Sequence, residues 1–186
     1  MSAATAIRRW ESTSDPSRWG VEITGFAPLT HRLEAELDRR IGELSPGRPA
    51  FVFTALGSTH TDELAVAVSR ASDFSSGARI CIALDQESLL AMNPDSLRNR
   101  NVGILLDQVD SNTPLSAVSR DLIEALRFDE SFVHLARTDA RLACILDAML
   151  RLAHDLGLAT LAPYEPHEGM ASGFEFDYVS APTAKR

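Results

Sequence analysis

Two aspartates stand directly behind short apolar segments that have the composition of buried strands. Asp107 follows residues 102–106 (VGILL), and Asp129 follows residues 126–128 (LRF). In an α/β barrel, the carboxyl ends of the strands form the face on which reactive groups gather. The pattern therefore predicts that both carboxylates lie at one mouth of such a barrel, with Arg127 close by.

Strand-like and helix-like segments alternate along the chain. The strand-like segments are short, apolar and partly β-branched or aromatic, as buried strands are; they are residues 50–55, 80–84, 102–106, 126–128, 159–161 and 176–179. Helical spacing of apolar residues connects them at residues 29–44, from Thr61, from Thr113 and over residues 138–156, where Gly157 ends the last helix. This alternation predicts βαβ units and a mostly parallel sheet.

Composition indicates one globular domain over residues 1–186, with short flexible ends at residues 1–4 and 182–186. The net charge of −8 argues against duplex nucleic acid or an anionic membrane as a partner. No apolar run approaches the roughly 18 residues of a membrane span, and residues 1–6 lack a signal-peptide pattern. We therefore expect a cytoplasmic protein, with Cys81 and Cys144 as buried free thiols.

One segment is close to a motif of a known family. Residues 126–133 (LRFDESFV) are similar to L-K-I-D-x-S-F-V, and residues 153–158 and 177–179 match A-x-x-L-G-L and D-Y-V. These motifs are typical of EAL domains, the cyclic-di-GMP phosphodiesterase family, which the chain therefore resembles. Weaker matches extend over most of the chain, at residues 5–10, 16–20, 25–29, 51–54, 82–86, 107–112 and 162–166. The resemblance implies an α/β barrel of EAL type.

The resemblance also implies that the family's chemistry is absent. EAL phosphodiesterases use two divalent metals, which need several anionic oxygen ligands. The positions of these ligands are occupied here by residues without a carboxylate: Thr5, Thr54, Ala83, Gln108 and Pro163. Only Asp107 and Asp129 remain, and Arg127 stands where the family has a lysine that must release a proton, which a guanidinium does not do. We expect no enzyme activity, no metal and no cofactor, and an ion pair of Arg127 with Asp107 or Asp129 that plugs the old site.

A ligand site remains as an alternative. The resemblance matches Arg9 to the nucleotide-contacting arginine of the family, so that Arg9, Asp107, Arg127 and Asp129 could bind cyclic di-GMP without cutting it. The competing interpretation makes Arg9 a surface residue and gives the two aspartates structural roles, either as helix caps or as partners of Arg127. We favour these structural roles.

The resemblance further predicts an incomplete barrel. EAL domains have a strand and a helix ahead of the name-giving segment, and this chain begins at about that segment, which leaves roughly seven strands where a closed barrel has eight. Either the N-terminal residues close the gap, or a partner protein or a second copy covers the open edge. The leading hypothesis is a catalytically inactive regulator in bacterial signalling that acts by protein–protein interaction; the alternative is a non-hydrolysing cyclic-di-GMP receptor.

Overall fold

The structure is a computed structural model that describes residues 6–15, 17–24, 51–55, 79–91, 103–118, 121–162 and 173–180. The helices predicted over residues 29–44 and from Thr61 lie outside these residues, as do the predicted flexible ends. Thr5 and Pro163 also lie outside them.

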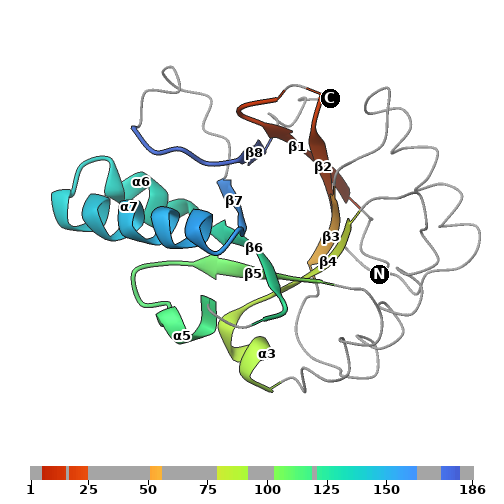
Figure 1. The fold of residues 1–186 in the computed structure, drawn as a ribbon, viewed down its shortest axis with the longest axis horizontal. Helices are drawn as coiled ribbons and strands as arrows, with labels where there is room; N and C mark the ends of the chain where they lie inside the picture. Colours follow the sequence, from red (N-terminus) through yellow and green to blue (C-terminus); the bar gives the residue numbers. More distant parts are fainter. Residues whose placement is uncertain are drawn as a thin grey trace, which may run out of the picture.

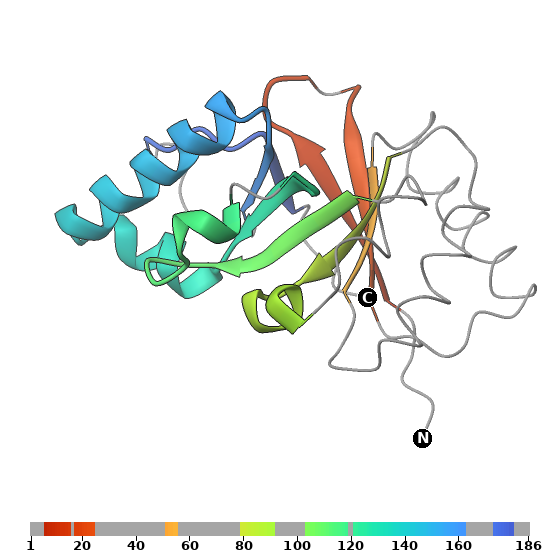
Figure 2. The ribbon, with the colours of Figure 1, turned by 60° about the horizontal axis from the view of Figure 1, so that its bottom comes forward.

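The strands form one closed barrel in chain order (Figures 1 and 2). Its strands are β1 (Ala6–Ser12), β2 (Trp19–Thr24), β3 (Phe51–Ala55), β4 (Arg79–Leu84), β5 (Gly103–Val109), β6 (Ile123–Phe128), β7 (Ala159–Ala162) and β8 (Tyr178–Ser180). From β2 to β8 every neighbouring pair is parallel, whereas β1 runs antiparallel to both β2 and β8. The predicted α/β barrel with a mostly parallel sheet is confirmed.

Closure of the barrel corrects one expectation. The sequence predicted roughly seven strands and an open edge, but β1 pairs with β2 on one side and with β8 on the other, so the described sheet has no free edge. The strand-like segments named from the sequence include neither β1 nor β2. The N-terminal residues thus close the gap by forming a hairpin, in which the Ser12 amide donates to the Arg18 carbonyl at 3.2 Å.

Helices pack outside the sheet and account for part of the predicted pattern. They are α3 (Gln86–Ala91), α5 (Leu115–Val118), α6 (Glu130–Ala136) and α7 (Ala140–Asp155). The predicted long helix is α7, and Gly157 ends it with φ +71°, a conformation that glycine adopts without steric cost. The helix predicted from Thr113 is shorter than expected, because residues 123–128 pair with β5 as a strand. Among the described helices, none combines the length and apolar character required to cross a bilayer.

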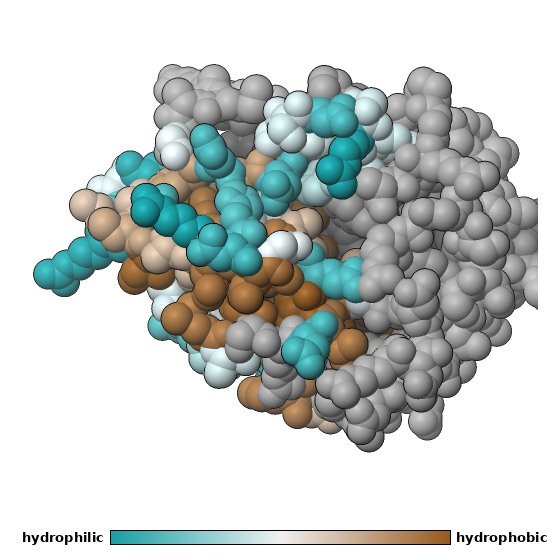
Figure 3. All heavy atoms as spheres, in the orientation of Figure 1, coloured by the Kyte–Doolittle hydropathy of each residue, from teal (hydrophilic) through white to brown (hydrophobic). Residues whose placement is uncertain are grey.

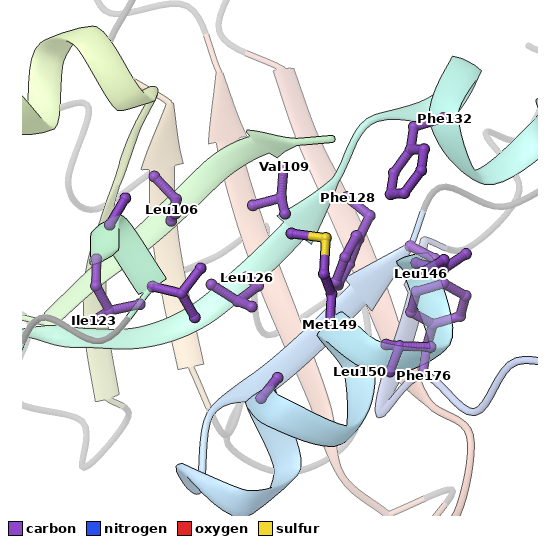
Figure 4. Close-up of a cluster of buried hydrophobic side chains, with 14 of the residues drawn as sticks. Leu106, Val109, Ile123, Leu126, Phe128, Phe132, Leu146, Met149, Leu150 and Phe176 are labelled. Atoms are coloured by element: carbon purple, nitrogen blue, oxygen red, sulfur yellow. The ribbon is translucent and has the colours of Figure 1, made fainter. Parts of the chain in front are cut away.

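Alternating side chains of the strands divide the core into two clusters. The larger lies between the sheet and the outer helices, where Leu126 and Phe128 of β6 meet Met149 and Leu150 of α7 (Figure 4). The smaller contains inward-facing residues of six strands: Trp10, Cys81, Ala83, Leu105, Ala125, Leu161 and Tyr178. Tyr178 is buried, and burial raises the pKa of its phenol above the ordinary value. Cys81 is buried as predicted, whereas Cys144 is exposed on α7, so the prediction for Cys144 was wrong.

Candidate functional site

Asp107 is placed by an irregularity at the carboxyl end of β5. The pairing of β5 with β6 shifts register between Leu106 and Val109, as at a β-bulge. Within the bulge, Gln108 has φ 56°, in the left-handed region that few side chains adopt. The Gln108 amide donates to Asp107 Oδ1 at 2.7 Å. The strained backbone and this hydrogen bond together position the Asp107 carboxylate.

Arg127 on β6 binds that carboxylate side-on. Its Nε donates to Asp107 Oδ1 at 2.6 Å, and its Nη2 donates to Asp107 Oδ2. Two parallel N–H···O bonds between a guanidinium and a carboxylate are among the strongest ion-pair geometries in proteins. The sequence predicted an ion pair of Arg127 with Asp107 or Asp129, and the structure shows the one with Asp107.

Glu22 is a third acid at this site, and the sequence analysis missed it. It lies on β2, is only 3% exposed, and accepts a hydrogen bond from Arg127 Nη1 at Oε1. Its other oxygen, Oε2, accepts from Trp10 Nε1 at 3.3 Å and lies 3.8 Å from Arg8 Nη1. A lone glutamate in the strand-like run Trp19–Thr24 (WGVEIT) was the signal available in the sequence. It was overlooked because β2 itself was not predicted.

The charges at this mouth balance. Glu22 and Asp107 contribute two carboxylates, while Arg8 and Arg127 contribute two guanidiniums. Burial disfavours the charged form of Arg127, but hydrogen bonds and Coulomb attraction from Asp107 and Glu22 outweigh it, so the pKa of the Arg127 guanidinium is raised above its usual value. Arg127 therefore stays protonated at physiological pH.

The residues present do not fit a divalent metal. All four carboxylate oxygens of Glu22 and Asp107 face N–H donors, of which three come from Arg127, one from Trp10 and one from the Gln108 backbone. A hard cation needs such oxygens as direct ligands. Nor do the described residues contain a cluster of three or more histidine, cysteine, aspartate or glutamate side chains suited to a metal ion.

The structure does not bring all of the predicted ligand-binding residues together. Asp129 caps α6, where its Oδ1 accepts from the Phe132 amide at 2.9 Å. Arg9 follows Arg8 on β1 and therefore points to the opposite face of the strand. There its guanidinium lies 5.5 Å from the ring centroid of Trp19, and its Nε lies 3.5 Å from Glu11 Oε1. Of the predicted set, the structure pairs Arg127 with Asp107.

The positions assigned to lost metal ligands are only partly visible. Ala83 lies on β4 with its side chain in the inner cluster, as a strand position facing the site requires. Gln108 is the exposed bulge residue beside Asp107, and Thr54 lies on β3. None of these three residues carries a carboxylate. The acids that meet at this site are therefore Glu22 and Asp107, which Arg127 binds together.

Solved structures share this fold at low sequence identity. No protein-family model matches the chain, and no curated protein matches it by sequence. The EAL domain of FimX from Pseudomonas aeruginosa, bound to c-di-GMP, is 14% identical; the match covers 96% of this chain and 88% of that one, with a TM-score of 0.64. The EAL domain of DcpA from Mycobacterium smegmatis is 15% identical over 95% and 90% of the two chains, with a TM-score of 0.61.

A longer protein also matches. BlrP1 from Klebsiella pneumoniae, solved as a manganese and cyclic-di-GMP complex, is 14% identical, and the match covers 97% of this chain and 54% of that one with a TM-score of 0.63. These similarities agree with the α/β barrel of EAL type that the resemblance implied. The chain therefore has the fold of an EAL domain.

Proposed function

We propose that this protein is a catalytically inactive EAL-type domain that regulates bacterial signalling through contact with another protein. The observation that supports inactivity is the position of Arg127, whose guanidinium binds Glu22 and Asp107 together. Phosphodiester hydrolysis of the EAL type needs metal-bound hydroxide and metal stabilisation of the phosphoryl oxygens. A guanidinium cannot generate that hydroxide, because it neither coordinates a water oxygen nor takes up a proton. Its charge could stabilise phosphoryl oxygens, but each nitrogen of Arg127 already donates to Glu22 or Asp107.

Glu22 makes this argument stronger than the sequence alone did. A third acid at the mouth would favour a metal if its oxygens were available. Both of its oxygens instead face donors on Arg127 and Trp10, and Arg8 lies beside them. A third acid therefore does not restore a metal site, because the Arg127 guanidinium already neutralises Glu22 and Asp107.

Exposed apolar side chains on the helices support contact with a partner protein. The open sheet edge that first suggested it is closed by β1. The remaining support is the absence of a replacement catalytic set among the described residues and the exposure of large apolar side chains on the helices. These are Leu90, Leu115, Leu135 and Ile145, together with Leu156 directly after α7; Figure 3 shows apolar surface between α5 and α7.

Chromatography of cyclic di-GMP after incubation with the protein and Mn²⁺ or Mg²⁺ tests the inactivity. The expected result is no linear dinucleotide above the level seen with the Asp107→Asn variant. Product that accumulates with the unmodified protein and disappears in Asp107→Asn would refute the proposal. An active EAL phosphodiesterase run in parallel shows that the assay conditions support turnover.

A second candidate function is a receptor that binds cyclic di-GMP without cutting it. Arg8 favours it, because its side chain is 51% exposed beside Glu22 and could meet a phosphate at the mouth. The solved FimX domain was also obtained bound to c-di-GMP. Calorimetric titration with the nucleotide decides: binding that weakens at least tenfold in Arg8→Ala but not in Arg9→Ala supports a receptor. If no binding is detected, the proposed function stays that of a regulator that contacts another protein.

A further inference from the structure

Arg127 connects strands that are not neighbours in the sheet. Its guanidinium extends from β6 to Asp107 on the adjacent β5 and to Glu22 on β2. In the barrel order, β3 and β4 separate β2 from β5. The two ion pairs therefore span the mouth, and one positive group holds carboxylates that come from opposite sides of the opening.

We infer that the Arg127 guanidinium is a resident cation, built into the chain at the point where these carboxylates converge, and that it makes the mouth independent of divalent metals. Removal of its charge should convert Glu22 and Asp107 into a site for a divalent cation. The inference rests on the proposed function, because both start from the contacts of Arg127.

The physical reason is charge compensation at a desolvated site. The side chains of Glu22, Asp107 and Arg127 are 4%, 12% and 17% exposed, so water screens them weakly. Without the guanidinium, two carboxylates held close together by separate strands would repel each other. A divalent cation that prefers oxygen ligands would relieve that repulsion. The strands already hold the carboxylate oxygens around the space that the guanidinium occupies.

Two substitutions separate charge from packing. Arg127→Met keeps an unbranched stem and removes the charge, whereas Arg127→Lys keeps a charge of one. The experiment titrates each folded variant and the unmodified protein with MnCl₂ at constant ionic strength. Electron paramagnetic resonance measures free Mn²⁺, and thermal unfolding measures its effect on stability.

The expected result differs between the variants. With Arg127→Met, the resonance signal of free Mn²⁺ falls in proportion to the protein concentration. The unfolding midpoint of this variant rises by about 3 to 10 °C when the Mn²⁺ concentration exceeds the dissociation constant about 10- to 100-fold. The unmodified protein and Arg127→Lys show neither effect. Adding Glu22→Gln and Asp107→Asn to Arg127→Met abolishes the response, which assigns the bound ion to these two carboxylates.

Two outcomes would overturn the inference. One is stoichiometric Mn²⁺ binding by the unmodified protein that is lost in Asp107→Asn. The other is a folded Arg127→Met variant that leaves the Mn²⁺ signal unchanged. If Arg127→Met does not fold, Arg127→Gln serves as the uncharged variant. Cyclic di-GMP is absent from these titrations, so a negative result here is distinct from turnover in the hydrolysis assay.

Discussion

Arg127 shows how one residue determines what a group of acids can do. Each of its three nitrogens donates to a carboxylate oxygen of Asp107 or Glu22. Loss of one partner from a buried ion pair leaves uncompensated charge, whereas loss of the whole set leaves a neutral site that costs little. The triad is therefore expected to respond to substitution in a strongly non-additive way.

We predict that Arg127→Met destabilises the fold by about 3 to 5 kcal/mol. The triple variant Glu22→Gln, Asp107→Asn, Arg127→Met should recover most of that loss, because it removes the buried charges together. Urea unfolding of the single and triple variants measures both values. Equal destabilisation of the two variants would mean that the carboxylates depend on other partners.

Tyr178 is the buried group whose titration the structure predicts. Burial raises its pKa, so the neutral phenol stabilises the fold. This contribution is fully present below the unfolded pKa of about 10 and is lost as the pH rises through the higher folded value. The chain has one other tyrosine, Tyr164. In a Tyr164→Phe variant, tyrosinate absorbance should appear above the pH at which a free tyrosine ionises, and Tyr178→Phe should lessen the alkaline loss of stability. Titration at the ordinary pKa would contradict the burial.

At the scale of elements, Asp129 belongs to helix α6 and not to the mouth. Its carboxylate accepts from the Phe132 amide, as an N-cap side chain does, and Glu130 adds a second acid in the first turn. The same residue directly follows β6, so its place in the sequence suggested a reactive acid. The contacts of Asp129 are those of a helix cap, the structural role that the sequence analysis favoured.

Asp129→Ala should therefore cost about 1 kcal/mol of stability without any change in ligand or metal binding. Asp129→Asn, which can still accept at the N-cap, should cost less. Denaturant unfolding of the two variants checks this order. Equal losses in the two variants would show that the charge, which both remove, matters and the cap hydrogen bond does not.

The elements also show what the sequence could and could not reveal. Strands β4 to β7 are buried on both faces, so their apolar runs identified them. β1 carries Arg8 and Arg9, and β2 carries Glu22 opposite Arg8. These charged residues interrupt the apolar pattern, so neither strand was predicted. An ion pair of Arg127 with Asp107 or Asp129 could be predicted because these residues lie at the carboxyl ends of two strand-like segments that follow one another in the sequence. The contact with Glu22 could not, because it joins residues 105 positions apart across the barrel.

At the scale of the molecule, the hairpin β1–β2 decides whether the barrel is open or closed. β1 pairs with β8 over three residue positions, Trp10, Glu11 and Ser12, and it supplies Trp10 to the inner cluster. Trp10 is 1% exposed and also donates to Glu22. Trp10 thus contributes to barrel closure, to the packing of the interior and to the charged site at the mouth.

Trp10→Ala should destabilise the protein by about 3 to 5 kcal/mol, because it empties the barrel interior beside Glu22. Trp10→Phe keeps the ring packing and loses the indole donor, so it should cost less. Thermal or urea unfolding ranks the two. A cost below about 1 kcal/mol for Trp10→Ala would indicate that β1 does not contribute to closure in solution.

The central claim, that Arg127 holds the mouth in place of metal ions, is tested most directly by a crystal structure grown with Mn²⁺ and read by anomalous scattering. We predict guanidinium density between Glu22 and Asp107 and no manganese peak within bonding distance of either carboxylate. Two manganese peaks about 3.5 to 4 Å apart at those carboxylates, with Arg127 turned away, would contradict the account.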